Sequence, residues 1–572
     1  MNLRTIVTGQ RLLLSIGAVL GLLGTAATLV QPLLIGDLIK AVAQDDAITQ
    51  PILFIALLFA ADAVLGASHA YLIGRAGENI VFDMRTTLTG RLLHAQMRAF
   101  NRLEHGDVFT RTVADTSLAR VALASSVAQM VTAGFSTAGC IAVMAWIDWR
   151  MLLATLGCLG AASVAALALA RAVRTASVAN REDTSAYGSG LLRALSALST
   201  VKASRAEERE AEDLAALADT ARLSGIKVTR LSAMLMPAMN VGTQVSLAVV
   251  IAWGMARTAT GALPIQDLTA FIMYLFYLVS PLVMLFMALS EFQQGRAAID
   301  RVKGLAAIDQ EPATGECAPR AAAAPAIAFR QVVFSYPGAA SPALEDVSFT
   351  LPTTGVTAIV GPSGAGKTTL FQLIERFHTP DTGSIRIRGT NADQMPLAEL
   401  RARVGLVEQD APLMRGTIRD NLTYARPDAS DSDIAVAVAA AHLTDVIAAL
   451  PHGLDTELGE HGSGLSGGQR QRLAIARALL TKPDVLLLDE VTANLDSDAE
   501  AALRETITEL GRHCQVLAIA HRISTTVGAD HILVIKDGRV HASGTHTELM
   551  RTDATYCRLV NQQLIPAGAS RD

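Results

Sequence analysis

Six apolar stretches in the first half of the chain limit its fold more than any other feature. Each is long enough to cross a bilayer, which takes about 20 residues, and the first is too long for the core of a signal peptide. Glycine, alanine and serine are frequent in them, which suits close helix packing in a membrane. Six such stretches exceed what the core of a soluble protein needs. The expected spans are 12–36, 51–73, 121–147, 151–171, 232–256 and 265–290.

Basic residues between the spans predict the orientation. The segments between spans two and three and between spans four and five carry many arginines and lysines, whereas the connection after span one has Asp45, Asp46 and only Lys40. Basic segments stay in the cytoplasm, so we expect both long segments and both termini there. Their pattern is helical, with tips near 102–116 and 194–210. The tips are either solvated stalks or docking points for another domain.

The remainder of the chain differs in character. Of the 572 residues, 51% are hydrophobic and 18% charged, too apolar for an ordinary soluble protein and too charged for one embedded entirely in lipid. The net charge of −5 and the lack of a dense basic block give no sign of a nucleic-acid partner. Five scattered cysteines predict neither a disulfide framework nor a zinc site. We expect a membrane domain over 1–308, a Pro- and Ala-rich linker over 309–326, and a second domain over 327–572.

Short β-rich runs alternate with helical segments in this second domain. Examples are VTAIVG, VLLLDE, VLAIAH and HILVIKDG. Such alternation predicts an α/β domain with a largely parallel sheet. The fold class is therefore an all-α, six-helix transmembrane domain followed by an α/β domain.

GPSGAGKTTL, at 361–370, has the pattern of a phosphate-binding P-loop. It follows the apolar strand VTAIV and precedes the helical TLFQLIERF, which is the context that this motif requires. The glycines let backbone N–H groups approach phosphates, Lys367 would reach the β- and γ-phosphates, and Thr368 would ligate Mg²⁺. The expected phosphate-binding set is Gly361, Pro362, Ser363, Gly364, Ala365, Gly366, Lys367, Thr368 and Thr369.

Two further strings belong with this loop. VLLLDE ends a buried strand in Asp489, expected to hold Mg²⁺, and Glu490, placed to polarise an attacking water. LSGGQRQR, at 465–472, begins a predicted helix, so Ser466 and the amides around Gly467 and Gly468 would form a second anion site. One P-loop already serves the phosphates on one side. The second site therefore points to a nucleotide held by a partner copy.

With these strings the chain resembles an ABC transporter, specifically an exporter-type half-transporter that fuses a membrane domain to an ABC-type P-loop ATPase domain. The resemblance covers nearly the whole chain, in motifs for the ATPase half and in layout for the membrane half. It implies an ATP hydrolase coupled to transport, with ATP and Mg²⁺ bound, in an inner (plasma) membrane with the ATPase domain in the cytoplasm.

The resemblance assigns roles to further residues. Tyr336 matches the aromatic that stacks on adenine, Gln409 the Q-loop residue that contacts Mg²⁺, and His521 the switch histidine at the γ-phosphate. Asp496 matches the D-loop aspartate, and Gln469 completes the signature that contacts ATP.

TELGEHG at 456–462 matches the stretch that touches the cytoplasmic tips, and GDVFTRTVADT at 106–116 the GDLxSRxxxD pattern. The sequence departs from the family in ANLD, usually SALD, and in His461, usually Arg. Neither departure removes a catalytic group, and each either tunes the interface or has no effect. The expected catalytic residues are Glu490, His521, Gln409 and Lys367.

ATP sandwiched between two copies implies a dimer of twelve spans. Every ATPase motif is intact, which favours a homodimer, and a partner with equally intact motifs remains an alternative. We expect export of a hydrophobic or amphipathic cargo such as a drug, a lipid or a secondary metabolite. An importer built on the same fold and carrying a siderophore-like cargo is an alternative, and an ABC ATPase acting on ribosomes or DNA is opposed by the six spans.

Cargo contacts are expected in the membrane half. Spans five and six are rich in methionine, whose flexible side chains suit an adaptable apolar surface or ordinary helix packing. Asn240 and Gln244 lie one helical turn apart and would present polar groups to a cavity. Asp62 in span two is a functional candidate because a carboxylate is costly in a membrane, unless it is paired within the bundle. The methionines are Met234, Met236, Met239, Met255, Met273, Met284 and Met287.

Overall fold

The computed structural model describes residues 8–312, 324–459, 462–491, 497–520 and 526–564. It separates into two compact units. Unit 1 comprises Met1–Leu93 and Leu103–Ile308, and unit 2 comprises His94–Arg102 and Asp309–Asp572. Each unit is described by itself below.

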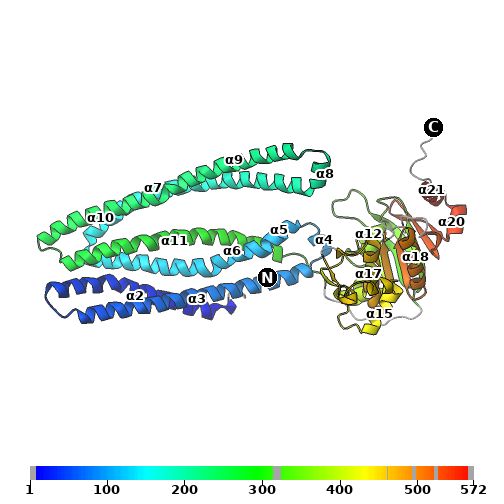
Figure 1. Ribbon diagram of the computed structural model, residues 1–572, viewed down its shortest axis with the longest axis horizontal. Coiled ribbons are helices and arrows are strands. Elements are labelled where there is room, and N and C mark those ends of the chain that lie inside the picture. Colours follow the sequence, from blue (N-terminus) through cyan, green and yellow to red (C-terminus); the bar gives the residue numbers. More distant parts are fainter. Residues whose placement is uncertain (1–7, 313–323, 460–461, 492–496, 521–525, 565–572) are drawn as a thin grey trace. The chain divides into compact units, whose positions relative to one another are not determined.

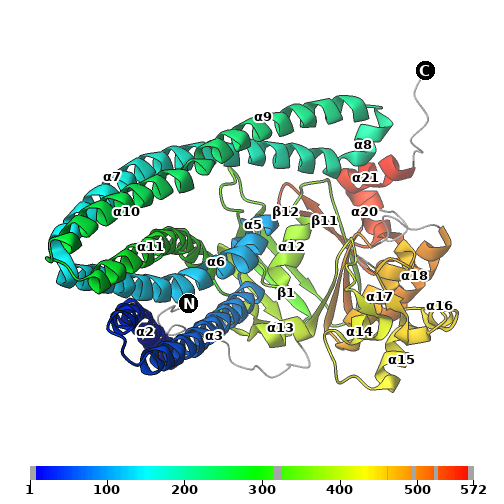
Figure 2. The same ribbon diagram turned by 60° about the vertical axis from the view of Figure 1, so that its left-hand side comes forward.

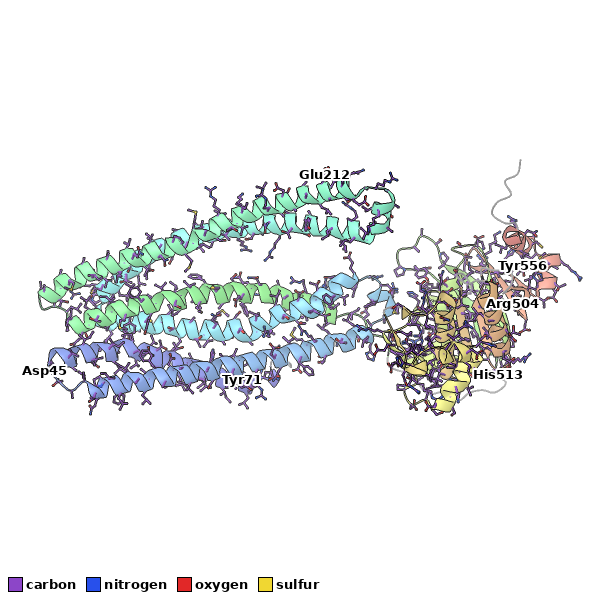
Figure 3. The ribbon with its side chains drawn as sticks, in the orientation of Figure 1. Asp45, Tyr71, Glu212, Arg504, His513 and Tyr556 are labelled. Atoms are coloured by element: carbon purple, nitrogen blue, oxygen red, sulfur yellow. The ribbon has the colours of Figure 1, made fainter. Side chains whose placement is uncertain are left out.

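Unit 1 is built of long helices that run side by side, α2 beside α3 and α7 beside α9 and α10 (Figure 1). Short turns such as the one that holds Asp45 lie at one end, and Glu212 lies near the other (Figure 3). Two π-helical stretches, η1 and η2, flank α6. The elements are α2 Arg11–Ala43, α3 Thr49–Leu93, α5 His105–Thr110, η1 Arg111–Asp115, α6 Thr116–Arg120, η2 Val121–Ser126, α7 Val127–Ser196, α8 Leu198–Ala203, α9 Glu207–Ala233, α10 Leu235–Ala259 and α11 Ile265–Ala306.

Five helices of the described chain are long and apolar enough to cross a membrane. The predicted spans three and four both fall in one of them, because α7 continues past Asp148, whose φ of −159° and ψ of 104° break the helix. The Asp148 carboxylate accepts hydrogen bonds from the N–H groups of Arg150 and Met151 at 2.9 and 3.0 Å, so it caps the helix that follows. Asp148 also pairs with Arg257 of α10. Six spans are therefore accommodated in five long helices.

The two long extensions that the sequence predicts to be cytoplasmic are helical, as expected. α3 runs on to Leu93, and α7 and α9 run on either side of α8 at the second tip. Near the first tip, Arg301 of α11 binds Asp115 through two hydrogen bonds of 2.6 and 2.7 Å. Asp115 ends the GDVFTRTVAD stretch and is buried. No local sequence pattern predicts this pair, whose two residues lie 186 positions apart.

Unit 2 contains the expected α/β fold with a largely parallel sheet. Six strands lie in the order β12-β11-β3-β10-β9-β6, with only β12 antiparallel to its neighbour. A second, antiparallel sheet has the order β2-β1-β4-β5. The strands are β1 Ile327–Phe334, β2 Leu344–Leu351, β3 Gly355–Val360, β4 Thr382–Ile387, β5 Thr390–Asn391, β6 Val404–Val407, β7 Gly416–Thr417, β8 Glu457–Leu458, β9 Val485–Asp489, β10 Gln515–Ile519, β11 His531–Lys536 and β12 Arg539–Gly544.

Helices cover this sheet, and α14, α15 and α16 gather beside α17 around a separate apolar cluster (Figure 2). Residues 309–311, at the start of the expected linker, pair with 94–96 through backbone hydrogen bonds of 2.8 Å. The linker residues 313–323 lie outside the described residues. The helices are α4 Met97–Phe100, α12 Lys367–Ile374, α13 Leu397–Arg403, α14 Ile418–Thr423, α15 Asp431–Ala440, α16 Thr444–Ala448, α17 Gly467–Leu480, α18 Ser497–Gly511, α20 His546–Thr552 and α21 Ala554–Leu564.

Candidate nucleotide site

The P-loop lies between β3 and α12, as its sequence context predicted. A β-carbon at Gly361 would lie 2.1 Å from the carbonyl oxygen of Ile535, so only glycine fits against β11. Gly366 precedes α12 with φ of 97°, a left-handed conformation in which glycine is unstrained. The residues from Pro362 to Gly364 are exposed or nearly so. The loop therefore presents backbone N–H groups at the start of a helix, the arrangement that binds phosphate.

Lys367 lies at the centre of the predicted chemistry. Its side chain is buried, and its ammonium donates hydrogen bonds of 2.9 Å to the carbonyl oxygens of Gly361 and Pro362. Burial lowers the pKa of Lys367, and the negative charges of Glu490 and Asp489 partly offset this effect. Two motifs about 120 residues apart in the sequence therefore meet. An ammonium held among acidic groups can neutralise the charge of a bound phosphate.

The acidic pair follows from the strand order. β9 lies next to β10, which lies next to β3, so the carboxyl ends of β9 and β3 meet at one edge of the sheet. Asp489 is the last residue of β9. Glu490 has φ of 47°, a left-handed conformation that is costly for a residue with a side chain. Such strain is typical of residues whose position matters for function.

The donors available for a metal are oxygen atoms. Thr368 is exposed at the start of α12, and the carboxylate of Asp489 ends β9. Hydroxyl and carboxylate oxygens are the ligands that Mg²⁺ prefers, together with nucleotide phosphates. The site thus fits the predicted Mg²⁺ in the chemistry of its donors.

The signature string begins α17 with a capping box. The Ser466 hydroxyl accepts a hydrogen bond from the N–H of Gln469 at 3.3 Å, and the Gln469 side chain accepts one from the N–H of Ser466 at 2.8 Å. The helix starts at Gly467, as predicted. Ser466 itself is exposed, at the positive end of the helix dipole. The cap uses the N–H groups of Ser466 and Gln469, so the Ser466 hydroxyl hydrogen and the N–H groups of Gly467 and Gly468 are outside it and suit an anion.

Tyr336 is held against the P-loop helix. Its hydroxyl donates to the Gln372 side chain at 2.7 Å and lies 3.1 Å from the Thr369 hydroxyl. Its ring packs edge-on against Phe334 and His378. These contacts place Tyr336 beside α12 and bury Thr369. Stacking on adenine stays a prediction for Tyr336, as does a phosphate contact for Thr369.

The other predicted residues are less defined. Gln409 is exposed two residues after β6. Asp496 and His521 lie outside the described residues, as do positions 460 and 461 of the TELGEHG stretch. Within that stretch, β8 pairs with β7. The roles of these residues stay predictions.

The sequence did not predict a group of charged residues around one buried carboxyl near the Q-loop. Glu375, just after α12, is 4% exposed, and burial raises its pKa to about 8, assisted by Glu408 and opposed by Arg401. Arg401 in turn binds Glu311 through two hydrogen bonds of 2.6 and 3.0 Å. The only sequence signal is a pair of charged residues, Glu375 and Arg376, between the apolar residues of LIERF.

Comparison with known proteins agrees with this geometry. A family model described as the ABC transporter transmembrane region matches residues 14–282, and one described as ABC transporter matches residues 344–493. A multidrug resistance ABC transporter ATP-binding and permease protein of Lactococcus lactis is 31% identical over 96% of this chain and 93% of its own length. An ATP-dependent lipid A-core flippase of Photobacterium profundum is 32% identical over 86% of this chain and 84% of its own.

A solved structure supports the same assignment. It is that of a bacterial Atm1-family ABC exporter with ATP bound, which is 28% identical and has a TM-score of 0.80 over the full length of both chains. The chain binds nucleotide through an ATPase domain and carries the membrane helices that ATP hydrolysis drives. This protein therefore belongs to the ABC transporter family, as an exporter-type half-transporter with its membrane and ATPase units fused in one polypeptide.

Proposed function

We propose that two copies of this chain form a homodimer that exports a hydrophobic or amphipathic molecule from the cytoplasm or the inner leaflet. The intact ATPase motifs support the homodimer. The names of the relatives, a multidrug transporter and a lipid A-core flippase, support the class of cargo.

One observation carries the cargo class. A cavity of about 830 Å³ lies between the second half of α7 and α10. Its lining is apolar, with Cys158, Met234 and Val241 among alanines and glycines. This volume lies within the range of about 300–1,000 Å³ that is usual for sites of drug-sized ligands. Of the seven methionines in spans five and six, for which a cargo surface or ordinary helix packing was expected, Met234 lines this cavity.

The proposed reaction uses residues from both copies. Lys367 and the P-loop amides hold the phosphates, Thr368, Gln409 and Asp489 hold Mg²⁺, and Glu490 polarises the attacking water. Ser466, Gly467, Gly468 and Gln469 of the partner copy would close over the same ATP, with Asp496 beside them and His521 at the γ-phosphate. Mg²⁺ would neutralise phosphate charge. Closure by ATP and opening after hydrolysis shift the membrane unit between two states.

The orientation is proposed from the basic segments. Asp45 lies at the end of unit 1 opposite Glu212 (Figure 3). In a variant without native cysteines, Asp45→Cys should react with an impermeant maleimide added outside cells. Glu212→Cys should react only after the membrane is opened. Labelling of Glu212→Cys from outside cells, with Asp45→Cys protected, would overturn the proposal that both termini are cytoplasmic.

ATPase activity tests the homodimer. The chain is purified alone, reconstituted in lipid, and compared with Glu490→Gln and with the control Glu505→Gln, an exposed residue of α18. We expect Mg²⁺-dependent activity that Glu490→Gln lowers by about 10²–10⁴-fold, the usual contribution of a general base. Inactivity of well-folded protein would overturn the homodimer. Stimulation by amphipathic compounds, and their ATP-dependent uptake into inside-out vesicles, would support the cargo class and export.

A further inference from the structure

A cavity of about 290 Å³ with several polar side chains in its lining lies within unit 1, between α2, α3, α7 and α11. Asp62 and His69 line it from α3, Thr28 from α2, and Gln129 and Ser136 from α7. Asp62 and His69 lie seven positions apart on α3, and so do Gln129 and Ser136 on α7, so each pair shares one face of its helix. The four helices pack side by side (Figure 1). The nucleotide chemistry makes no use of this cavity.

Two glycines of α2 make room for the polar side chains. A β-carbon at Gly21 would lie 2.6 Å from Nδ1 of His69, and one at Gly24 would lie 3.4 Å from Oδ1 of Asp62. His69 Nδ1 lies 2.7 Å from the carbonyl oxygen of Gly17. Because a carbonyl only accepts, Nδ1 must carry the hydrogen, and Nε2 of the neutral ring is an acceptor.

The Asp62 carboxylate has too few donors. Its one hydrogen bond in the described structure is with the Thr28 hydroxyl, at 3.1 Å. That hydroxyl also lies 3.1 Å from the carbonyl oxygen of Gly24, and its single hydrogen cannot serve both acceptors fully. A carboxylate offers about four acceptor positions. Among the described residues that line the cavity, none is lysine or arginine.

An unpaired carboxylate in a membrane must be neutralised by a proton or by a cation. The other polar groups of the lining can accept hydrogen bonds. The hydroxyls of Thr25, Thr28 and Thr132 lie within hydrogen-bond distance of backbone carbonyl oxygens to which they donate, so they offer lone pairs. The Gln129 carbonyl and, in the neutral ring, Nε2 of His69 also accept. A protonated amine supplies both the positive charge and the N–H donors that such a lining needs. The side-chain N–H of Gln129 donates a hydrogen bond to the sulfur of Met284 at 2.8 Å. The Gln129 carbonyl oxygen takes no part in that contact and can accept a hydrogen bond from a ligand.

We propose that this cavity binds the protonated amine of an amphipathic cation, with Asp62 as its counter-ion. The volume lies at the lower limit for ligand sites, so it suits a head group and not a whole amphiphile. The apolar tail would extend past Met284. This inference rests on the proposed amphipathic cargo and narrows it to molecules that carry an ammonium group.

Equilibrium binding tests the proposal without ATP hydrolysis. The full chain in lipid nanodiscs is titrated with radiolabelled dodecylamine, which is protonated at pH 7.5, and with 1-dodecanol, its uncharged match. Empty nanodiscs measure partition into lipid. We expect the wild type to bind the amine at least about tenfold more tightly than the alcohol, a difference of about 1.4 kcal/mol.

Asp62→Asn should abolish this preference while leaving dodecanol binding unchanged. Thr28→Val should weaken amine binding to a smaller extent, about two- to fivefold. Asp37→Asn is the matched control, because Asp37 is an exposed carboxylate of α2 that does not line the cavity. Melting temperature and binding of an ATP analogue, measured in the same nanodiscs, report whether each variant is folded.

Three outcomes would overturn the proposal. Equal affinity of the wild type for amine and alcohol would mean that Asp62 is neutralised by a proton alone. Unchanged amine affinity in Asp62→Asn would place any amine site elsewhere. A Na⁺-dependent ATPase activity that is lost in Asp62→Asn, with amine affinity unchanged, would assign the cavity to an inorganic cation. Failure of amphiphiles to stimulate ATPase would instead count against the proposed cargo and leave the binding result intact.

Discussion

The ATPase unit places its polar groups at the ends of short elements, whereas the membrane unit places them in the middle of long ones. Ser466 begins α17, Asp489 ends β9, and the P-loop joins β3 to α12. In contrast, Asp62 and His69 lie well inside the 45-residue helix α3. Ends of elements demand particular residues at fixed spacing, because turns and caps use backbone groups. Chemistry in the middle of a helix leaves only isolated polar residues, whose partners come from other helices.

The largest expected effect is a loss of ATP affinity when a glycine of the P-loop is replaced, compared with a glycine inside a membrane helix. Gly361→Ala would force a methyl group to within 2.1 Å of the Ile535 carbonyl oxygen, and backbone cannot move aside as a side chain can. We expect ATP affinity, measured by titration of the purified protein, to fall at least about 100-fold, or about 2.7 kcal/mol. Gly157→Ala in α7 is the control, since a β-carbon there meets nothing within 4 Å. Similar ATP affinity in both variants would show that the P-loop tolerates displacement.

The second prediction separates capping from catalysis within the ATPase unit. Ser466→Ala and Thr545→Ala each remove the side chain of a capping box, at α17 and α20. Loss of an N-cap costs about 1 kcal/mol of stability, so both should lower the melting temperature slightly. Only Ser466→Ala should also lower ATPase activity, by about 10–100-fold, because it loses a hydrogen bond to a charged phosphate. Equal ATPase activity of the two variants would mean that Ser466 caps α17 and does not contact the nucleotide.

The same contrast explains what the sequence revealed. The strings around Lys367, Asp489 and Ser466 carried both their local structure and their chemistry, and the strand, loop and helix follow as expected. The membrane spans followed from apolar length, and the break at Asp148 falls in the expected gap between spans three and four.

Partners distant in the sequence could not be predicted. Arg301 meets Asp115, and Thr28 and Gln129 join Asp62, only because packing brings separate helices together. No pattern in the sequence around either residue indicates such a contact. The one available signal for the cavity around Asp62 was His69, which follows Asp62 by two helical turns on the same face of an apolar span.

Glu375 provides a test of burial in the ATPase unit. Its pKa in the folded chain is about 8, mainly because of burial, against an ordinary value of 4.5. Between pH 5 and 8 the unfolded chain releases this proton while the folded chain retains it, so stability should fall as pH rises through this window. Glu375→Gln cannot ionise. Its free energy of unfolding should therefore exceed that of the wild type increasingly toward pH 8, by up to about 1.4 kcal/mol per pH unit, and its melting temperature should rise accordingly.

The control for this pH series is Glu505→Gln, which removes an exposed carboxylate from the same unit. It should track the wild type at every pH from 5.5 to 8.5. Parallel curves for the wild type and Glu375→Gln would mean that Glu375 is ionised in the folded protein, with Arg401 outweighing burial.

The last comparison concerns two aspartates of one motif in unit 1. Asp115 is buried and binds Arg301 through two hydrogen bonds, whereas Asp107 forms a more exposed pair with Arg111 of the same helical stretch. Asp115→Asn should lower the free energy of unfolding by about 1.5–3 kcal/mol, the contribution of hydrogen bonds to charged groups. The loss stays in this range because Arg301 is half-exposed, so water can solvate its guanidinium once the carboxylate is gone. Asp107→Asn should cost less than about 1 kcal/mol, as surface pairs do. Melting temperatures in lipid measure both. An Asp107→Asn variant as unstable as Asp115→Asn would show that the motif is held by its local helix and not by α11.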